Sequence, residues 1–518
     1  MTIAQPGVLS AESGADPACH SRPAPAPGGT GRLSSPISAA AREILFDRDT
    51  APAPDPVAAE LGLISQVDRA HVVMLAERGI VDRARAGELL RGIESLRWQG
   101  FAPLHDVPAP RGRYLAYESH LIDTLGAEVG GILHSGRSRN DLNATVVRLR
   151  LREPHERLLA ESDALGRALL DRARRWAGVT MPAYTHHQPA VPITYGHYLA
   201  GVASALVRDV EGVWQAGAEI DQNPLGAGAV GGTSLPVDQH RTTALLGFAT
   251  PIPNSLHAVA SRDLVLRQLS AATVLGVLLC RVSHDLQAWT SAEAGLLRLA
   301  DDVVGSSSMM PQKRNPFLLE HVQGRALAPL GAFTASASAM ATARFTNAIA
   351  VGTEAVAPAW SALEAATDAV VLLRLVVEGA EPVPERMYER AVDGQTAATH
   401  LAERLVDAGV PFRQAHHEVG AIAKEALDAG VKLHDVARVR LAGQPEHVLA
   451  ALDPAEVAQH AAHGGGPARE SVLAAVAAAE TGFARIRAAA EERRRRWSQA
   501  EAGLDDAVRS LIDPRSIP

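Results

Sequence analysis

The sequence predicts an all-α fold, and three observations support this prediction. Hydrophobic residues make up 47% of the 518 residues but aromatic residues only 4%, so the core consists mainly of Ala, Leu and Val, which suit closely packed helices. Apolar residues recur at three- and four-residue steps over long stretches. We find no convincing strand pattern and no short-period repeat. The length indicates two or three domains.

The chain divides into an extension and three expected helical domains. Residues 1–38 are rich in Pro, Ala, Gly and Ser, a composition typical of disorder. We expect an N-terminal helical domain over 39–140, a central long-helix bundle over 141–380 and a small C-terminal helical domain over 381–518.

Helical periodicity begins after the extension. The stretch Gln66–Leu75 is amphipathic, Val81–Leu96 repeats apolar residues at helical spacing, and Glu118–Leu125 predicts a further helix. We interpret His71, in the first of these stretches, as a buried structural histidine rather than a catalytic one.

Polar residues gather at the predicted start of a long helix. His134-Ser-Gly-Arg-Ser-Arg-Asn-Asp141 precedes apolar positions from Val146 onward. A helix N-terminus attracts anions, Arg139 can bind a carboxylate bidentately, and Asn140 offers amide donors. A capped helix start with surface arginines is the alternative.

Prolines interrupt the next stretch. The helix over 141–178 is followed by Met181–Pro192, which contains Tyr184, Thr185, His186, His187 and Gln188. A histidine can carry a proton at neutral pH. The spacing alone favours an ordinary polar loop, and no HExxH-type metal spacing occurs here or at His416-His417-Glu418.

Two more long helices are expected, over 194–220 and 263–296. A glycine-rich connection, 223–234, follows the first of them; because it follows a helix rather than a strand, it is no dinucleotide fingerprint. A helix of over thirty residues spans roughly 50 Å. Helices of this length imply a bundle, and such long apolar faces are often buried by oligomerisation.

The loop at 305–316, Gly-Ser-Ser-Ser-Met-Met-Pro-Gln-Lys-Arg-Asn-Pro, has the features of a mobile anion-binding loop. Lys313 is one of only three lysines, with Lys424 and Lys432. Its charge would lower the pKa of a nearby serine hydroxyl, which could then act as a base. An ordinary surface loop with one lysine explains the composition equally well.

Shorter helices follow this loop. Helices are expected from Phe317 and over 353–378, and shorter ones follow Pro382. We interpret the charge run Arg493–Arg496 as a solvated helix face.

The composition excludes several classes of function. A net charge of −8 gives no reason to expect nucleic acid or an anionic membrane as a partner. Cys19 and Cys280 are far apart, which fits a reducing compartment. The most apolar run, Ala271–Cys280, is far shorter than the ~20 residues of a membrane span. No signal peptide is evident, so we expect a cytoplasmic protein.

The loop 305–316 resembles the signature of the fumarase/aspartase superfamily, Gly-Ser-Ser-x-Met-Pro-x-Lys-x-Asn-Pro. The stretches His134–Asp141 and Tyr184–Pro189 match in the order of that superfamily, and a similar glycine-rich loop occurs at 223–234. The form Gly-Arg-Ser-Arg-Asn-Asp is similar to the argininosuccinate lyase branch. This resemblance covers about residues 55–430.

The resemblance implies a homotetramer with a central twenty-helix bundle. Each active site would combine three motif regions from three subunits, cleave C–N or C–O bonds of succinyl compounds, and release fumarate without a cofactor or metal. Ser307 aligns with the catalytic serine, His186 with the helper histidine and Glu320 with its acidic partner. Lys313 would stabilise the charge. The substrate-binding residues implied are Ser138, Arg139, Asn140, Thr185, Gln188, Ser308, Met310 and Asn315.

This chain departs from true argininosuccinate lyases in one segment. In those enzymes a Tyr-Asn-Lys-Asp-Leu-Gln-Glu-Asp-Lys segment holds the arginine part of the substrate, whereas here the matching stretch is Arg344–Glu354, with Asn347 near the tyrosine position. Phe317 replaces the usual aspartate after Asn-Pro. A guanidinium needs acidic or amide partners, so we expect another N-substituted aspartate as substrate, as in secondary metabolism or aminopolycarboxylate breakdown (for example of ethylenediamine-disuccinate).

Three alternatives remain. The first is a housekeeping argininosuccinate lyase of arginine biosynthesis whose pocket has changed. The second, from another class, is a non-catalytic scaffold like the lens crystallins of this family, against which the intact site residues argue. The third is a cycloisomerase or adenylosuccinate-lyase-type enzyme, which the Gly-Arg-Ser-Arg-Asn-Asp form disfavours.

Overall fold

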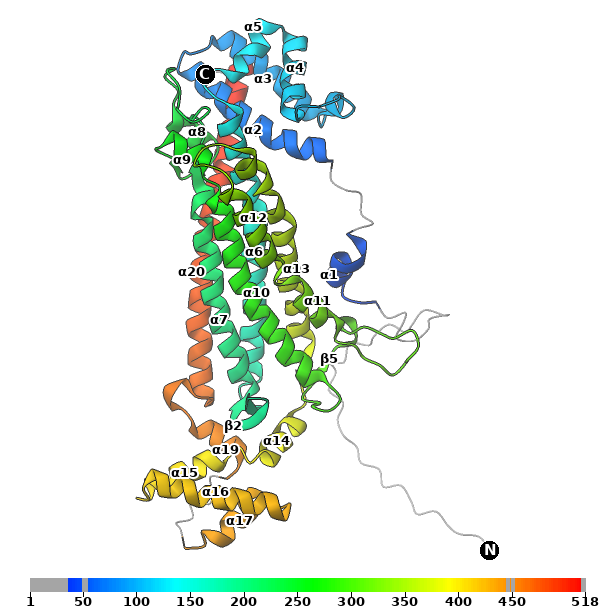
Figure 1. Ribbon diagram of the computed structural model, residues 1–518, viewed down its shortest axis with the longest axis vertical. Coiled ribbons are helices and arrows are strands. Elements are labelled where there is room, and N and C mark those ends of the chain that lie inside the picture. Colours follow the sequence, from blue (N-terminus) through cyan, green and yellow to red (C-terminus); the bar gives the residue numbers. More distant parts are fainter. Residues whose placement is uncertain (1–35, 49–54, 444–447, 449–451, 514–518) are drawn as a thin grey trace, which may run out of the picture.

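The computed structural model describes residues 36–48, 55–443, 448 and 452–513. The expected disordered extension at 1–38 therefore lies almost wholly outside the described residues. The molecule is elongated, with a bundle of long helices along its axis and smaller helical groups at both ends (Figure 1). This is the all-α architecture that the sequence predicted.

Long helices build the central bundle. They are α6 (Arg139–Arg175), α7 (Tyr195–Ala216), α10 (Asp263–Thr290), α13 (Ala357–Gly379) and α20 (Arg469–Ile512), joined by α11 (Phe317–Arg325) and α12 (Ala328–Ala341). Their facing side chains are mainly Leu, Val and Ala and form the largest hydrophobic cluster. Among the described helices, α10 is long and apolar enough to cross a membrane, but it packs here against α7, α12 and α13.

One end of the bundle carries the N-terminal helices and the glycine-rich connection. These elements are α2 (Pro56–Glu77), α3 (Arg83–Trp98), η3 (Ala102–Leu104), α4 (Arg113–Leu125), α5 (Ala127–Gly130), η4 (Gly131–His134), η5 (Gly217–Asp221), β3 (Gln222–Asn223), α8 (Gln239–Leu245), β4 (Thr250–Pro251) and α9 (Ser255–Ala260). Their core also includes Leu504, Val508 and Leu511 of α20. His71 is 1% exposed, and its Nε2 lies 2.8 Å from the carbonyl oxygen of Ser135, which confirms the structural role predicted for it.

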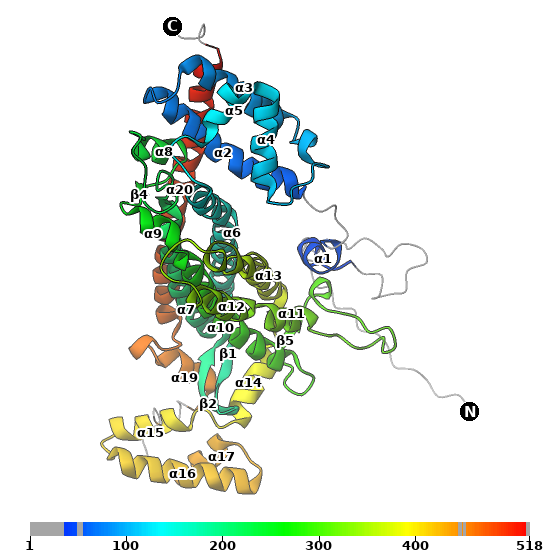
Figure 2. The same cartoon turned by 45° about the horizontal axis from the view of Figure 1, so that its top comes forward.

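The other end carries a β-hairpin and the small C-terminal helices (Figure 2). The hairpin pairs β1 (Thr180–Thr185) with β2 (Gln188–Thr194) in antiparallel fashion. The helices are α14 (Pro384–Asp393), α15 (Ala398–Asp407), α16 (Phe412–Ala429), α17 (Leu433–Arg440) and α19 (Pro454–His460), with η8 (His463–Gly465) before α20. The expectation that the chain has no strand is therefore wrong at this point, because the prolines of the hairpin concealed its pattern.

The charge run in α20 is solvated only in part, because Arg494 and Arg495 are exposed whereas Arg493 is buried and Arg496 half-buried. Arg493 is 3% exposed, and its guanidinium bonds to the Glu156 carboxylate and covers the Trp214 ring at 4.1 Å. Arg496 bonds to Asp221 at 2.7 Å. Helix α20 packs along α7 and α6, so residues 469–512 lie with the central bundle rather than with the small helices that precede them.

The remaining short elements flank the signature loop. Strand β5 (Leu297–Leu299) pairs with β6 (Ala380–Pro382) in antiparallel fashion, and η6 (Asp301–Val303) follows it directly. The π-helix η7 (Ala350–Glu354) precedes α13. Helix α1 (Ala39–Arg42) and the π-helix η2 (Glu43–Asp47) pack against the bundle near α13.

Candidate active site

The first group of site residues lies at the N-terminus of α6. Ser138 is the N-cap, and its Oγ accepts a bond from the Asn140 N–H at 3.3 Å. In the opposite direction, the Oδ1 atom of Asp141 accepts a hydrogen bond from the Ser138 N–H at 2.9 Å. This capping box fixes the first turn, so the free N–H groups and the positive dipole end of a 37-residue helix point towards one place.

Asp141 also attaches this helix start to the glycine-rich connection. Its Oδ2 accepts the N–H groups of Gly226 and Gly228 at 3.0 and 2.9 Å, and Asn140 Nδ2 donates to the Ala229 carbonyl at 3.0 Å. Gly226 and Gly228 have φ values of 102° and 61°, a conformation that favours glycine. The sequence interpretation assigned no role to Asp141, although the Ser-Arg-Asn-Asp capping signal was visible.

The two arginines of this motif have opposite environments. The Arg137 side chain is fully buried against the Asp68 carboxylate at 2.5 Å, and its Nη2 donates to the Tyr114 hydroxyl. Burial is the largest single influence and lowers the pKa of Arg137, but the charge of Asp68 and the interactions with Tyr114 together outweigh it and raise this pKa above its ordinary value. Arg139 is exposed, and within the described part of the chain its side chain makes a long 3.5 Å bond to the Arg111 carbonyl, so its guanidinium is accessible to an anionic ligand.

The second group lies at the tip of the β-hairpin. Thr185 pairs with Gln188, and His186 and His187 form the two-residue turn with φ values of 53° and 59°. Positive φ at both central positions is typical of a type I′ turn. Positive φ is uncommon for non-glycine residues, among which Asn, Asp and His adopt it most often, and such backbone strain is common at functional sites. All four side chains are exposed.

The third group is the signature loop. The backbones of Gly305 and Asn315 exchange two hydrogen bonds, of 2.8 and 3.0 Å, which close the base of the loop. Arg314 holds this base through the Asp301 carboxylate and the Leu299 carbonyl. A Cβ on Gly305 would lie 3.1 Å from the Phe317 ring. The loop therefore projects from a fixed base.

Within the loop, Ser307 has the environment of a stabilised oxygen. Its Oγ accepts the backbone N–H of Met310 at 3.0 Å and that of Met309 at 3.4 Å. Backbone donors favour the charged form of an acid. Lys313, Ser308 and Met310 are exposed on the same loop, and Asn315 is half-buried at its base.

The single chain does not bring these three groups together. Ser138 lies before α6 and the hairpin follows the other end of this helix, so about 55 Å of helix separates them at 1.5 Å per residue. The signature loop projects beside α11 (Figure 1). Glu320 Oε1 accepts a 3.5 Å bond from Gln287 Nε2 rather than contacting His186. The expected histidine–glutamate pair thus stays a prediction that requires a second copy of the chain.

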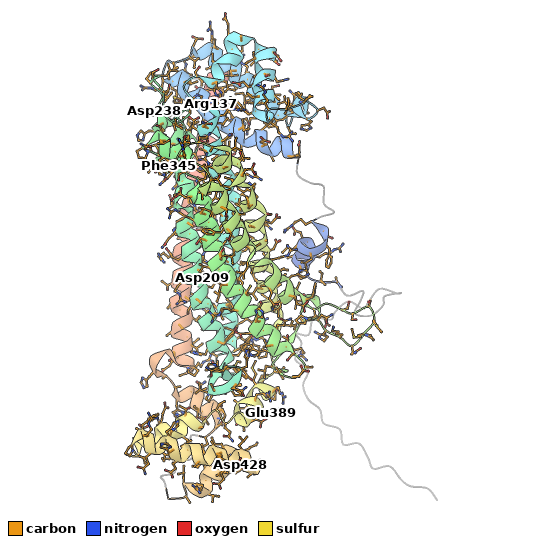
Figure 3. All side chains as sticks on the ribbon, in the orientation of Figure 1. Arg137, Asp209, Asp238, Phe345, Glu389 and Asp428 are labelled. Atoms are coloured by element: carbon orange, nitrogen blue, oxygen red, sulfur yellow. The ribbon has the colours of Figure 1, made fainter. Side chains whose placement is uncertain are left out.

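The segment expected to hold the amine lies towards the end of the molecule that carries Ser138. Figure 3 places Phe345 and Arg137 towards this end. Phe345 is 65% and Ile349 71% exposed, while Asn347 is half-buried. Phe317 packs instead beside His321, with the ring centroids 5.9 Å apart. Apolar side chains therefore stand at, or next to, the two positions where argininosuccinate lyases carry guanidinium-binding groups. Phe317 is at the first position, and Phe345 and Ile349 flank Asn347 at the second.

Two families match the chain, and they cover separate parts of it. The family described as "Lyase" matches residues 108–330, which include all three groups. The family described as "Argininosuccinate lyase C-terminal" matches residues 395–459, which comprise most of the small C-terminal helices.

Several relatives match most of the chain. The argininosuccinate lyase of Haloarcula marismortui is 36% identical over 84% of this chain and 88% of its own length. That of Methanoculleus marisnigri is also 36% identical, over 86% of this chain and 91% of its own.

Solved structures extend this similarity to the fold. One of them is an EDDS lyase variant with bound fumarate, in which methionine replaces an aspartate and a tyrosine. It is 28% identical to this chain, with a TM-score of 0.84 over 94% of this chain and 99% of its own. A class II fumarase from Schistosoma mansoni, at 17% identity and a TM-score of 0.66 over 80% of this chain and 93% of its own, shares the fold.

Proposed function

Because the chain belongs to the argininosuccinate lyase branch of the fumarase/aspartase superfamily and is a carbon–nitrogen lyase, we propose that it interconverts an N-substituted aspartate with fumarate and an amine other than arginine. The observation that carries this proposal is the contrast between the two halves of the site. The groups for the fumarate half are intact, and those for a guanidinium are replaced.

In this proposal Ser307 is the base. Its Oγ, as an alkoxide, takes the proton from the carbon β to the leaving nitrogen, and the loop N–H groups that bond to Oγ support the alkoxide. The electrons of the broken C–H bond form a doubly charged aci-carboxylate. Lys313 and Asn315 stabilise this charge, which is usually the largest catalytic contribution.

The second half of the reaction breaks the C–N bond. The aci-carboxylate collapses to fumarate, and the electrons of the C–N bond leave with the nitrogen, which takes up a proton. Ser138, Arg139 and Asn140 at the helix start, and Thr185 on the hairpin, hold the substrate carboxylates. His186 and Glu320 are the titratable side chains that this proposal adds to the site.

The amine half is proposed to accept a neutral or apolar amine. Phe317 stands where the branch usually has aspartate, and Asn347 stands near its tyrosine. These two positions are 30 residues apart, and the aspartate and tyrosine replaced by methionine in the fumarate-bound EDDS lyase variant have the same separation. Apolar groups at these positions are thus compatible with fumarate binding. They offer no carboxylate to an arginine guanidinium.

The complete site is proposed to form in a homotetramer. The distance along α6 separates the helix start from the hairpin within one chain, so residues from several copies must combine. The exposed Val274 and Val277 on α10 and Leu330 on α12, at 56%, 46% and 49% exposure, provide apolar surface for this assembly.

The first test is fumarate release from argininosuccinate, followed by ultraviolet absorbance. We expect no release above a Ser307→Ala control, since the amine half lacks partners for the guanidinium. Rapid release that requires Ser307 would instead assign the chain to arginine biosynthesis, the function favoured by the names of its 36%-identical relatives.

A further inference from the structure

A short N-terminal segment packs beside the signature loop, apart from the other N-terminal helices. We define residues 38–48, which comprise α1, η2 and Arg48, as the N-terminal strap. Ala41 and Ile44 of this strap are buried in the hydrophobic cluster of the central bundle, and α1 contacts α13. Helix α2, which begins only eight positions after the strap, belongs to the other cluster. The strap is therefore an independent attachment to the bundle.

The strap is fixed at its first residue to the segment before the signature loop. The Ser38 N–H donates to the Asp302 carbonyl at 2.9 Å. Asp302 lies in η6, three residues before Gly305. This contact holds the backbone from which the loop departs.

The strap is fixed at its last residue to α13, and through α13 to the helix that follows the loop. Arg48 forms a bidentate pair with Asp368, with nitrogen–oxygen distances of 2.7 and 2.8 Å. Asp368 is fully buried on α13, and it also accepts a bond from Arg325 Nη1 at 2.8 Å. Arg325 is the last residue of α11, the helix that directly follows the loop and carries Glu320.

The geometry of Asp368 makes the two arginines interdependent. A buried carboxylate is costly unless charges and hydrogen bonds compensate it, and here two guanidinium groups share that task. If Arg48 is removed, Arg325 alone must balance the buried charge of Asp368, and the end of α11 can shift to bring its guanidinium closer. The bond to Asp368 raises the pKa of Arg48, so its guanidinium is charged at neutral pH.

We propose that Arg48 is a positioning residue for the reaction at Ser307. Through Asp368 and Arg325 it fixes α11, and with the Ser38–Asp302 contact the strap holds both ends of the loop that carries Ser307 and Lys313. This inference rests on the proposed function for its catalytic meaning. The structural part of the inference, that the strap limits opening of the loop, does not depend on the reaction that the protein catalyses.

The chain offers a direct measure of loop opening. Its three lysines are Lys313 on the exposed loop, Lys424 on α16 and Lys432 before α17. An endoproteinase that cuts only after lysine therefore reports on the loop through one cleavage and on the C-terminal helices through the other two. Proteolysis of a folded protein follows the population of locally open states.

The experiment compares full-length Arg48→Ala, Arg48→Lys and Arg42→Ala with the unchanged protein. Arg42 lies on the same strap, and among the described residues its side chain pairs with the exposed Asp47, so its substitution is the matched control. We expect cleavage after Lys313 to accelerate about tenfold in Arg48→Ala, as for the loss of a charge-assisted bidentate pair. Cleavage after Lys424 and Lys432 should keep its rate.

Arg48→Lys keeps the charge without the planar fork and should give an intermediate rate. Bound fumarate should slow cleavage after Lys313 less in Arg48→Ala than in the unchanged protein. If all three cleavages accelerate together in Arg48→Ala and Arg48→Lys, the strap only stabilises the fold; if none does, it does not restrain the loop. Either result overturns the proposal. Because cleavage requires no turnover, failure of the proposed lyase activity is recognised separately.

Discussion

Asp141 is the residue on which the proposed anion-binding helix start depends most. Its two oxygens accept N–H groups from Ser138, Leu142, Gly226 and Gly228. One buried carboxylate thus orients both the capping box and the glycine-rich connection. The sequence revealed Ser138, Arg139 and Asn140 through their motif. It did not reveal Asp141's contacts, because Gly226 and Gly228 lie 85 and 87 residues further along the chain.

Replacing Asp141 with Asn should destabilise the protein. The amide group has one oxygen in place of two, so its NH₂ would face the backbone donors of the glycine-rich connection. We expect the free energy of unfolding to fall by about 2–4 kcal/mol and fumarate affinity to fall with it. Urea denaturation and titration calorimetry measure the two effects. Asn143→Ala, an exposed change on the same helix, is the control. If the two variants have the same free energy of unfolding and the same fumarate affinity, Asp141 does not orient the helix start.

His155 predicts how stability depends on pH. It is fully buried and bonds to Gln268 at 2.9 Å. Burial, with a smaller contribution from the nearby Arg493 charge, lowers its pKa to about 3 from 6.5. Between these values the unfolded chain binds the proton and the folded chain does not. Stability from this group is therefore complete above the unfolded pKa and is lost as the pH falls towards the folded pKa.

His155→Gln should flatten the acid side of the stability profile. The free energy of unfolding of the unchanged protein should lose about 3 kcal/mol from this residue between pH 6.5 and about 4, and the variant should lack that contribution. Denaturant titrations across this range test it. The exposed His240→Gln should keep the original slope; a His155→Gln slope identical to that of this control would refute the assignment.

At the scale of elements, helices were predictable and the hairpin was not. Apolar periodicity identified the long helices, because each buries one face in the bundle. In the hairpin, Pro182, Pro189 and Pro192 hid the alternation, and His186-His187 lacked the Asn-Gly signal of its turn type. Within the run Arg493–Arg496, the sequence could not distinguish Arg493 and Arg496 from the two exposed arginines, because their carboxylate partners, Glu156 and Asp221, lie on distant segments.

The strained turn gives a prediction of its own. His187 has a φ of 59°, which costs a residue with a Cβ about 1 kcal/mol relative to glycine. His187→Gly should therefore raise the free energy of unfolding by roughly this amount. A thermal melt of the two proteins measures it, and an unchanged or lower melting temperature would show that the turn is not strained.

At the scale of the whole molecule, the expectation that each site combines regions from three subunits came from the family resemblance and not from the physical pattern of the residues. Motif matching identified Ser138, His186 and Ser307, and the structure then showed that one chain keeps their elements apart. The surfaces between chains decide which copies of the chain share a site. In the sequence, the apolar periodicity of these surfaces is the same as that of the core. The apolar α10 illustrates this, since its core and outward positions are alike in composition.

Shared sites predict that two inactive variants can restore each other. Ser307→Ala and His186→Asn each remove a different region of the proposed site. If they are mixed, dissociated and reassembled, some sites should contain both intact regions, and activity should rise well above that of either parent. A mixture that stays as inactive as its components would indicate that one chain supplies the whole site. Light scattering of the unchanged protein should show a tetramer.

The proposed reaction joins fumarate at Ser307 to an amine other than arginine. The most direct measurement incubates the protein with fumarate and a panel of amines that includes arginine, and detects adducts by mass spectrometry, with Ser307→Ala as control. We predict a Ser307-dependent adduct of fumarate with a neutral or apolar amine and none with arginine. An adduct with arginine alone would contradict this proposal, because it would show that the amine half still recognises a guanidinium despite Phe317 and Asn347.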